Sequence, residues 1–290
     1  MSRLPAVRAV PLSEIPAAYP QMRFAVRFAD GRESSHDAGA RHPLAGTGTL
    51  VLAAAVGRCA ESDPGLLGER LTLTAEHRRA SRSGTLRRMD SELRLTVDDA
   101  LALIVGTGDG ACLQAVLEFL ADRGVDLLGV ARTLIGDWNL VDTEISGFEP
   151  ETGVTTPADL CTALSGLSGR VLGWMGQVFE PAGLASALPG FGPRTVPHHT
   201  VAGWDPAGAL GGDPIGGRSR PGFASVLVLP DTAVVAAYHP ALQRDGTAVT
   251  PLEVSTAFGT LGLSVWRGWT GRGQPPSAPP STPPSTPQST

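Results

Sequence analysis

Two threonines at the start of an apolar helix are the residues of this chain best placed to do chemistry. The stretch from His42 to Val56 reads HPLAGTGTLVLAAAV, a Pro- and Gly-rich turn followed by a helix that we expect from Thr47 to about Cys59. The N-terminus of a helix favours negative charge, so a hydroxyl placed there can be activated. Thr47 or Thr49 is therefore either a reactive hydroxyl or the residue whose side chain caps the helix.

Lysine does not occur in the sequence, so all 23 of its basic residues are arginine. Arginine keeps its proton near neutral pH, which excludes a lysine general base, a Schiff base and a P-loop lysine. The net charge of −5 and the pI of about 5.7 argue against nucleic acid as a partner, because nucleic-acid-binding proteins present a clustered basic face.

The three cysteines, Cys59, Cys112 and Cys161, are widely spaced and form no CxxC motif and no Cys/His ligand set. We expect reduced, mostly buried thiols and no metal. The glycine-rich stretch 208–217 lacks the strand and helix that flank a dinucleotide fingerprint, so no cofactor is expected. Prolines interrupt the region where a signal peptide needs an apolar run, and no stretch is long enough to span a bilayer. These observations predict a cytoplasmic protein without a membrane partner.

Apolar periodicity predicts the elements that would position the chemical groups. Phe24, Val26 and Phe28 alternate with other residues as in a half-buried strand. Thr96 is expected to cap a helix that glycines at 106–110 interrupt, before a second helix over 111–121. The other predicted elements are a short helix at 12–18, a weak strand at 33–40, a helix starting at Thr156-Pro157, a helix at 171–187, a strand within 194–204, a hairpin of strands 223–229 and 233–238, and a helix at 251–269.

The segment 61–94 is charged and is expected to form a loop. It carries an arginine cluster made of Arg78, Arg79, Arg82, Arg87 and Arg88. One interpretation of the cluster is a solvated surface, and the other is a site for an acidic ligand or partner.

The order and spacing of these motifs resemble those of class A β-lactamases and related penicillin-recognising serine hydrolases, over roughly residues 22–270. In that family a Ser-x-x-Lys motif opens an apolar helix, a Ser-Asp-Asn motif lies between two helices, and a Thr-Thr-Pro sequence starts another helix. The resemblance implies an α/β (α+β) fold with an antiparallel five-stranded sheet flanked by helices and an all-helical lobe. It implies an N-terminal lead (1–21), a domain at 22–270, and a Pro/Ser/Thr tail at 271–290 that should be disordered. Within the domain, 22–60 and 190–270 would form the α/β lobe and 61–189 the helical lobe.

The residues at the family's catalytic positions differ in this chain. Thr47-Gly48-Thr49-Leu50 stands where the resemblance places Ser-x-x-Lys, and Leu50 cannot accept a proton. Gly108-Asp109-Gly110 stands in place of Ser-Asp-Asn, so only the central Asp is kept. His199-Thr200-Val201 stands in place of Lys-Thr-Gly.

The resemblance therefore implies a candidate catalytic set of Thr47, Asp109 and His199, which would supply a hydroxyl, a carboxylate and an imidazole. His198 would lie on the opposite face of the strand from His199. The candidate substrate-binding residues are Thr49, Gly108, Gly110, Glu144, Thr200 and Trp204. Asp142, Glu144 and Glu149 fall where the family carries its general-base glutamate, although none of them has a Glu-x-x-x-Asn pattern.

Three functions remain open at this point. The first is a β-lactamase-like protein whose cleft is repurposed to bind a small acyl, amide or lactam metabolite, with non-hydrolytic acid–base chemistry at His199, in specialised metabolism. The second is a pseudoenzyme that only binds or regulates. The third is a residual β-lactamase or esterase-type hydrolase that uses Thr47. Each of them has a small molecule as its partner, and family-type β-lactam hydrolysis is not expected.

Overall fold

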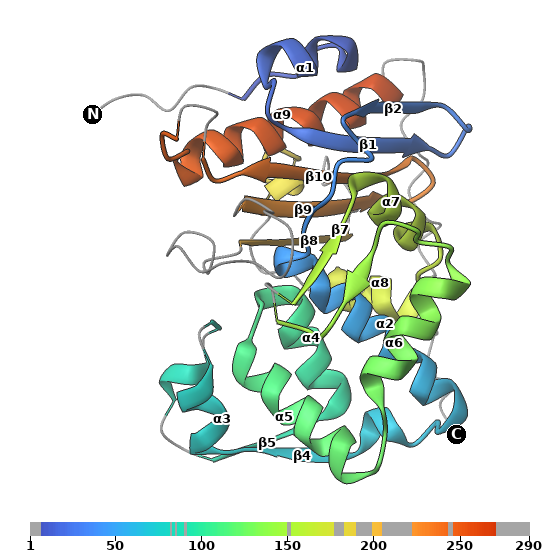
Figure 1. Ribbon diagram of the computed structural model, residues 1–290, viewed down its shortest axis with the longest axis vertical. Coiled ribbons are helices and arrows are strands. Elements are labelled where there is room, and N and C mark those ends of the chain that lie inside the picture. The colour runs from blue at the N-terminus through green and yellow to red at the C-terminus, as the bar shows by residue number, and fades with distance from the viewer. Residues whose placement is uncertain are drawn as a thin grey trace, which may run out of the picture.

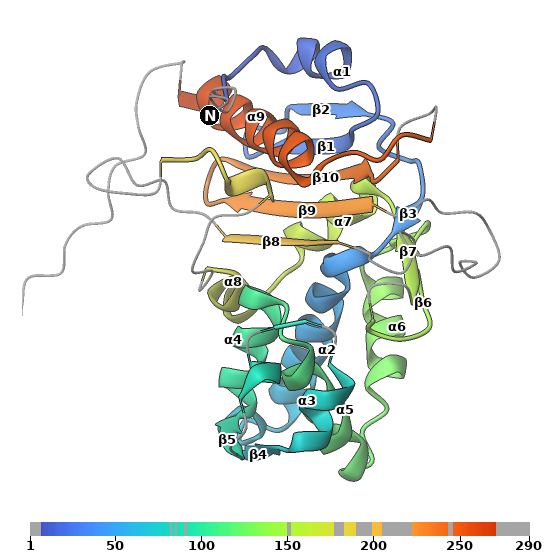
Figure 2. The same cartoon turned by 90° about the vertical axis from the view of Figure 1, so that its left-hand side faces the viewer.

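The computed structural model describes residues 7–81, 83–84, 86–89, 92–149, 152–176, 183–189, 199–204, 222–242 and 246–270. A five-stranded sheet and the helices that cover it form one part of the molecule, and a mostly helical part lies against the β8 edge of the sheet (Figures 1 and 2). This arrangement confirms the predicted α/β fold with an antiparallel sheet and a helical lobe.

The sheet has the strand order β2-β1-β10-β9-β8, and each neighbouring pair is antiparallel. Its strands are β1 (Arg23–Phe28), β2 (Glu33–His36), β8 (His199–Trp204), β9 (Gly222–Leu229) and β10 (Ala233–Pro240). The predicted hairpin is confirmed: β9 and β10 pair with Ala233 opposite Leu229, and the turn contains Asp231 at a φ of 54°. Asp is among the residues that tolerate this left-handed conformation.

Both faces of the sheet are covered. Phe24, Val26 and Phe28 face a core that includes Phe258 and Leu261 of α9 (Pro251–Thr270), the predicted C-terminal helix. The interpretation of β1 as half-buried holds for Arg23 and Arg27, which are partly exposed, but not for Ala25, which is buried because α7 (Pro157–Ser165) packs on that face. There Cys161 Sγ donates a hydrogen bond to the carbonyl of Ala25 at 3.2 Å.

The N-terminal residues belong to the same packing. The short helix predicted at 12–18 is present as a 3-10 turn η1 (Leu12–Glu14) followed by α1 (Ile15–Ala18). Ile15 is fully buried among the side chains of the sheet and α9. The segment before β1 therefore contributes to the core.

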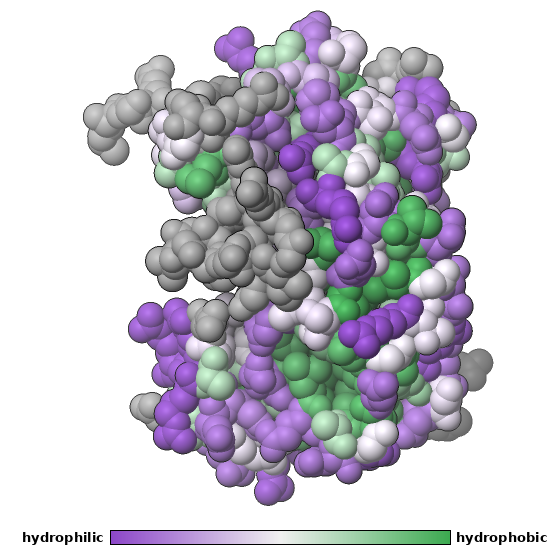
Figure 3. Space-filling model, in the orientation of Figure 1, coloured by the Kyte–Doolittle hydropathy of each residue, from purple (hydrophilic) through white to green (hydrophobic). Residues whose placement is uncertain are grey.

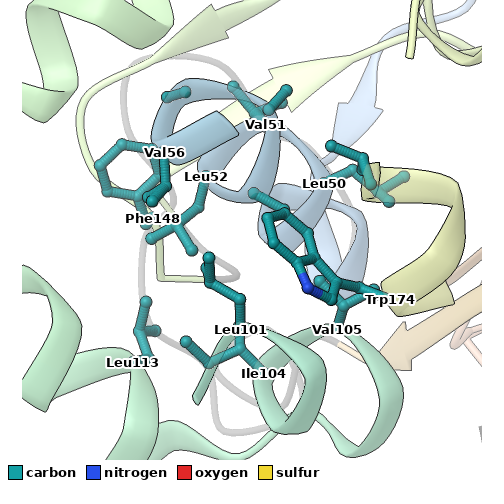
Figure 4. Close-up of a cluster of buried hydrophobic side chains, with 14 of the residues drawn as sticks. Leu50, Val51, Leu52, Val56, Leu101, Ile104, Val105, Leu113, Phe148 and Trp174 are labelled. Atoms are coloured by element: carbon teal, nitrogen blue, oxygen red, sulfur yellow. The ribbon is translucent and has the colours of Figure 1, made fainter. Parts of the chain in front are cut away.

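Helix α2 (Gly48–Ser62) runs through the centre of the helical part, and its residues from Leu50 to Val56 are all buried. It contacts α4 (Val97–Thr107), α6 (Leu127–Asp137) and α8 (Gly169–Met175). Figure 4 shows Leu52 pointing toward the α4 side chains and Trp174 of α8 lying beside the helix. Trp174 Nε1 donates to Asp98 Oδ1 at 3.1 Å, which joins α8 to the start of α4.

The remaining elements complete the helical part and its margins. They are α3 (Ala75–Ala80), α5 (Gly110–Asp122), β3 (His42–Pro43), β4 (Arg70–Leu73), β5 (Leu93–Thr96), β6 (Glu144–Ile145), β7 (Gly153–Thr155) and the 3-10 turns η2 (Ala45–Thr47), η3 (Leu66–Gly68), η4 (Leu86–Arg88) and η5 (Gly183–Ala185).

Several predictions about local structure need correction. The segment 61–94 is not only loop, since β4 and β5 pair antiparallel and Thr74 caps α3 through the N–H of His77. The predicted helix at 171–187 ends at Met175, and residues 177–182 and the tail 271–290 lie outside the described residues. The caps predicted at Thr96 and Thr156 are confirmed, because each side chain accepts a hydrogen bond from an Asp N–H three residues later.

Candidate functional site

The turn that leads into α2 uses both candidate hydroxyls within the backbone. Thr47 is 0% exposed, and its Oγ1 donates to the carbonyl of Leu44 at 2.5 Å. Thr49 Oγ1 donates to the carbonyl of Gly46 at 2.8 Å. The prediction that one of them caps the helix is wrong, because η2 continues directly into α2 and Thr47 has helical backbone angles, φ −73° and ψ −12°. A capping side chain needs an extended residue at that point.

The same turn contains a strained residue. Ala45 has a φ of 47°, a conformation that is uncommon for residues other than Gly, Asn and Asp and is often found at functional sites. Gly46 and Thr49, one helical turn apart, are both partly exposed, whereas Thr47 and Leu50 are buried. The accessible face at the start of α2 therefore carries Gly46 and Thr49.

The β6–β7 connection lies beside this helix start. Leu44 N donates to the carbonyl of Gly153 at 3.0 Å, and a Cβ added at Gly48 would lie 3.6 Å from the carbonyl oxygen of Phe148. The next residue is Glu149, whose Oε1 accepts a hydrogen bond from Gln114 Nε2 of α5 at 2.6 Å. Of the three carboxylates considered from the sequence, Glu149 is thus the one held between the helix start and α5.

The other two carboxylates have different surroundings. Glu144 is 75% exposed and forms an ion pair with Arg41 at 2.6 Å. The backbone N–H of Asp142 donates to Asp159 Oδ2 at 3.0 Å. Gln114, the partner of Glu149, was not recognised in the sequence, because nothing in a lone glutamine on a helix indicates a carboxylate 35 residues later.

Asp109 lies fully buried at the break between α4 and α5. Its Oδ1 accepts hydrogen bonds from the N–H groups of Ala111 and Cys112, both at 3.1 Å, and so caps α5. Its Oδ2 accepts from the N–H of Leu86 at 3.0 Å. Gly108 ends α4 in the left-handed conformation, with φ 63°. Burial and the negative charge of Asp109 raise the pKa of the Cys112 thiol far above its usual range.

Strand β8 lies next to both the helix start and α4, since it contacts η2 and α4. Thr200 is buried, and its Oγ1 donates to the carbonyl of Val226 on β9 at 2.8 Å. The backbone of His199 pairs with Val228. The side chains of His199 and Trp204, and the whole of His198, lie outside the described part of the chain.

A buried histidine was overlooked in the sequence. His42, at the start of the turn into α2, stacks on Tyr238 of β10 with 4.3 Å between ring centroids. Its Nδ1 donates to the carbonyl of Pro43 at 2.7 Å, and its buried Nε2 has no partner among the described residues. Burial is the main cause that lowers the pKa of His42 to about 4. His42 is therefore neutral at physiological pH.

Among the described residues, no group of three His, Cys, Asp or Glu side chains is arranged to hold a metal ion. Within the same residues, no helix combines the length and the apolar character needed to cross a bilayer. The three cysteines are unpaired, and Cys112 and Cys161 are buried, as predicted.

The chain is similar to known proteins both in sequence and in fold. The profile of the beta-lactamase enzyme family matches residues 11–196. One similar structure is a β-lactamase from Sphaerobacter thermophilus, with a TM-score of 0.67, 18% identity and coverage of 91% of this chain and 97% of that one. Another is a β-lactamase from Burkholderia vietnamiensis, with a TM-score of 0.61, 18% identity and coverage of 90% of this chain and 100% of that one. A third is PBP-A, with a TM-score of 0.63, 19% identity and coverage of 91% and 98%.

At these identities the structural neighbours establish the fold alone. No curated protein sequence matches the chain. The family profile covers well over half of the 290 residues. The chain therefore belongs to the beta-lactamase enzyme family.

Proposed function

We propose that this chain binds a small acyl, amide or lactam compound without forming a covalent intermediate with it. The observation that carries the proposal is the state of Thr47, which is buried and donates its hydroxyl proton to the carbonyl of Leu44. A nucleophilic hydroxyl must reach the substrate and give its proton to a base. Leu50, one turn later, is apolar, and the chain contains no lysine.

We also propose that the positions of the family's Ser and Lys lie one residue earlier in this chain than the sequence led us to expect. We call this alignment of the Ser-x-x-Lys motif with the chain the register of the site. Two side chains of an i, i+3 motif can act on one substrate only if both reach the same accessible face. Gly46 and Thr49 meet this condition, whereas Thr47 and Leu50 do not. In this register the nucleophile position carries no side chain, because it is Gly46, and the base position carries the hydroxyl of Thr49.

A second candidate function is acid–base chemistry on the bound molecule, and Glu149 is the observation that favours it. A carboxylate held by Gln114 next to the start of α2 could accept a proton from a ligand in that position. His199 stays in this proposal as a second acid–base group, because β8 contacts η2. Thr200 would contribute through its backbone, since its hydroxyl is bound to Val226. The hydrolase that uses Thr47 is the alternative that the geometry disfavours.

We propose a cytoplasmic location as well. Three unpaired thiols are typical of proteins kept in a reducing compartment. The ligand would then be a molecule present inside the cell.

The test is equilibrium binding of benzylpenicillin, a lactam with an amide side chain, by titration calorimetry on the purified protein. The proposal predicts saturable, reversible binding from which the penicillin is recovered unchanged. Glu149→Gln, which keeps the size of the side chain, should weaken binding, and Glu14→Gln at the exposed turn η1 is the matched control. Absence of binding, or steady conversion to the penicilloate, would refute the proposal.

A further inference from the structure

The segment between α3 and β5 concentrates positive charge in a chain that is acidic overall. From Thr74 to Met89 the sequence contains five arginines against the single Glu76, a formal charge of +4, whereas the whole chain carries −5. Arg78 is buried and donates to the carbonyl of Leu73 at 3.2 Å, so it belongs to the protein core. Arg79, Arg87 and Arg88 are exposed, and Arg82 lies outside the described residues.

This segment is attached to the break between α4 and α5. Leu86 N donates to Asp109 Oδ2 at 3.0 Å, and Ser83 Oγ donates to the carbonyl of Gly108 at 2.7 Å. Gly84, at a φ of 86°, lies so close to Asp109 that an added Cβ would approach Oδ2 to 2.2 Å. Arg87 and Arg88 follow directly, so the buried aspartate fixes the position of the backbone that carries them.

A second set of contacts holds the other end of the segment. His77 Nδ1 accepts from the N–H of Thr74, which leaves Nε2 to donate to Glu118 Oε2 of α5 at 2.6 Å. The side chain of Leu86 is buried. Because Asp109 holds the N–H of Leu86, the backbone at Arg87 and Arg88 does not have to be ordered when an anion binds to them, and this lowers the entropic cost of binding.

The turn η4, which carries Arg87 and Arg88, contacts α3 and α5 and is bonded through Leu86 to Asp109, the residue that joins α4 to α5. Helix α4 begins next to β5 at the far end of the lobe and contacts β8, which also contacts η2 at the start of α2. Figures 1 and 2 show α3 and the loop after it on the same side of the lobe as the α4–α5 break. In Figure 3, hydrophilic side chains gather over α3 and this loop at the left edge of the molecule.

We infer that Arg87 and Arg88 form an anion subsite beside the proposed ligand site, and that the ligand carries a carboxylate, sulfonate or phosphate group at the end that meets the helical lobe. The inference rests on the proposed function for the position of the ligand. Guanidinium groups bind such anions through paired hydrogen bonds. A small anion fits better than a nucleic acid, because the net charge outside this segment is strongly negative and would repel a long polyanion.

The first arm of the test uses inorganic sulfate and does not depend on the proposed function. The Nε–Hε signals of the arginines are followed by NMR during a sulfate titration. Saturable shifts are expected for Arg87 and Arg88, and weak linear shifts for the exposed Arg94 of β5. Equal linear shifts at all three would overturn the subsite. The double variant Arg87→Lys/Arg88→Lys should keep part of the sulfate affinity, whereas Arg87→Gln/Arg88→Gln should lose it. The melting temperature of the second variant should stay within about a degree of that of the original protein, because both side chains are exposed.

The second arm compares benzylpenicillin with carbenicillin, which carries one additional carboxylate on its side chain. The subsite predicts about tenfold tighter binding of carbenicillin, as expected for one charge-assisted contact. The Gln/Gln variant should lose this preference, and the control Arg94→Gln should keep it. Equal affinity of the two compounds for the original protein would overturn the subsite and leave the proposed function standing. If neither compound binds, the proposed function fails and the sulfate titration alone decides the subsite.

Discussion

Asp109 Oδ2 accepts a hydrogen bond from the backbone N–H of Leu86 at 3.0 Å, while the other oxygen of the same carboxylate caps helix α5. One buried side chain thus joins a helix start to a loop that lies 23 residues earlier in the sequence. Asp109 was predicted as a catalytic residue, and its described contacts are those of a structural one. The prediction of a catalytic role stays untested.

Replacement of Asp109 should therefore reduce stability. Asp109→Ala removes a cap, worth about 1 kcal/mol, and leaves a buried N–H of Leu86 without an acceptor, which costs about 1–3 kcal/mol more. Asp109→Asn can still cap α5 but presents an amide where Leu86 needs an acceptor, so its loss should be smaller. Urea unfolding of the three proteins measures both values. Equal stability of Asp109→Ala and the original protein would contradict this role.

The stability of the protein should fall as the pH decreases from about 6.5 to 4. Burial lowers the pKa of His42 from its ordinary value of 6.5 to about 4 in the folded protein. In this window the unfolded chain binds the proton more readily, so the free energy of unfolding decreases with decreasing pH, by about 3 kcal/mol in total for this residue.

The variant His42→Phe should keep the ring stacked on Tyr238 and remove this titration. Its free energy of unfolding should depend less on pH between 6.5 and 4 than that of the original protein. Burial also lowers the pKa of His239, which contributes a slope of the same sign in both proteins. Urea unfolding at several pH values measures the difference, and identical pH profiles would refute the assignment to His42.

The register of the site can be tested by rebuilding the family's motif at each of the two positions. Gly46→Ser/Thr49→Lys places a serine and a lysine on the accessible face, so this double variant should become acylated by benzylpenicillin. Thr47→Ser/Leu50→Lys places the same residues at buried positions and should lose stability because of the buried lysine. Acylation of the second variant alone, detected by intact mass, would reverse the proposed register.

The thiols should differ in reactivity toward Ellman's reagent in the folded protein. Burial raises the pKa of Cys161 to about 12 and that of Cys112 further, and both are inaccessible. Cys59 is partly exposed, with a pKa that burial raises. We expect one slowly reacting thiol, none in Cys59→Ser, and three after denaturation. Rapid reaction of more than one thiol in the folded protein would contradict the described packing.

The elements with a long and regular pattern were predictable. The β9–β10 hairpin and α9 have uninterrupted apolar runs bounded by turn residues, and the structure contains both. Strands β4 and β5 were missed, because an alternation of four residues, with only Leu71 and Leu73 buried, is too short to recognise within an arginine-rich segment. The burial of Ala25 on the second face of β1 was missed, since Cys161 of α7, which packs there, comes 136 residues later in the chain.

The candidate site was predictable only in part. The helix start and the break at Asp109 were located from the sequence, because glycines and caps mark them. The register of the Ser-x-x-Lys positions could not be located in this way, since η2 adds a helical turn before α2 and directs the side chain of Thr47 toward the core. The contacts of Glu149 with Gln114, and of His42 with Tyr238, join distant segments, and such pairs leave no pattern in a single sequence.

The intact mass of the unmodified protein after long incubation with benzylpenicillin shows directly whether a covalent intermediate forms. We expect the mass of the protein alone, because Thr47 is buried with its hydroxyl bound to Leu44 and Gly46 has no side chain to acylate. The variant Gly46→Ser/Thr49→Lys is the positive control. An increase by the mass of one penicillin on the unmodified protein, mapped to Thr47 or Thr49, would refute non-covalent binding.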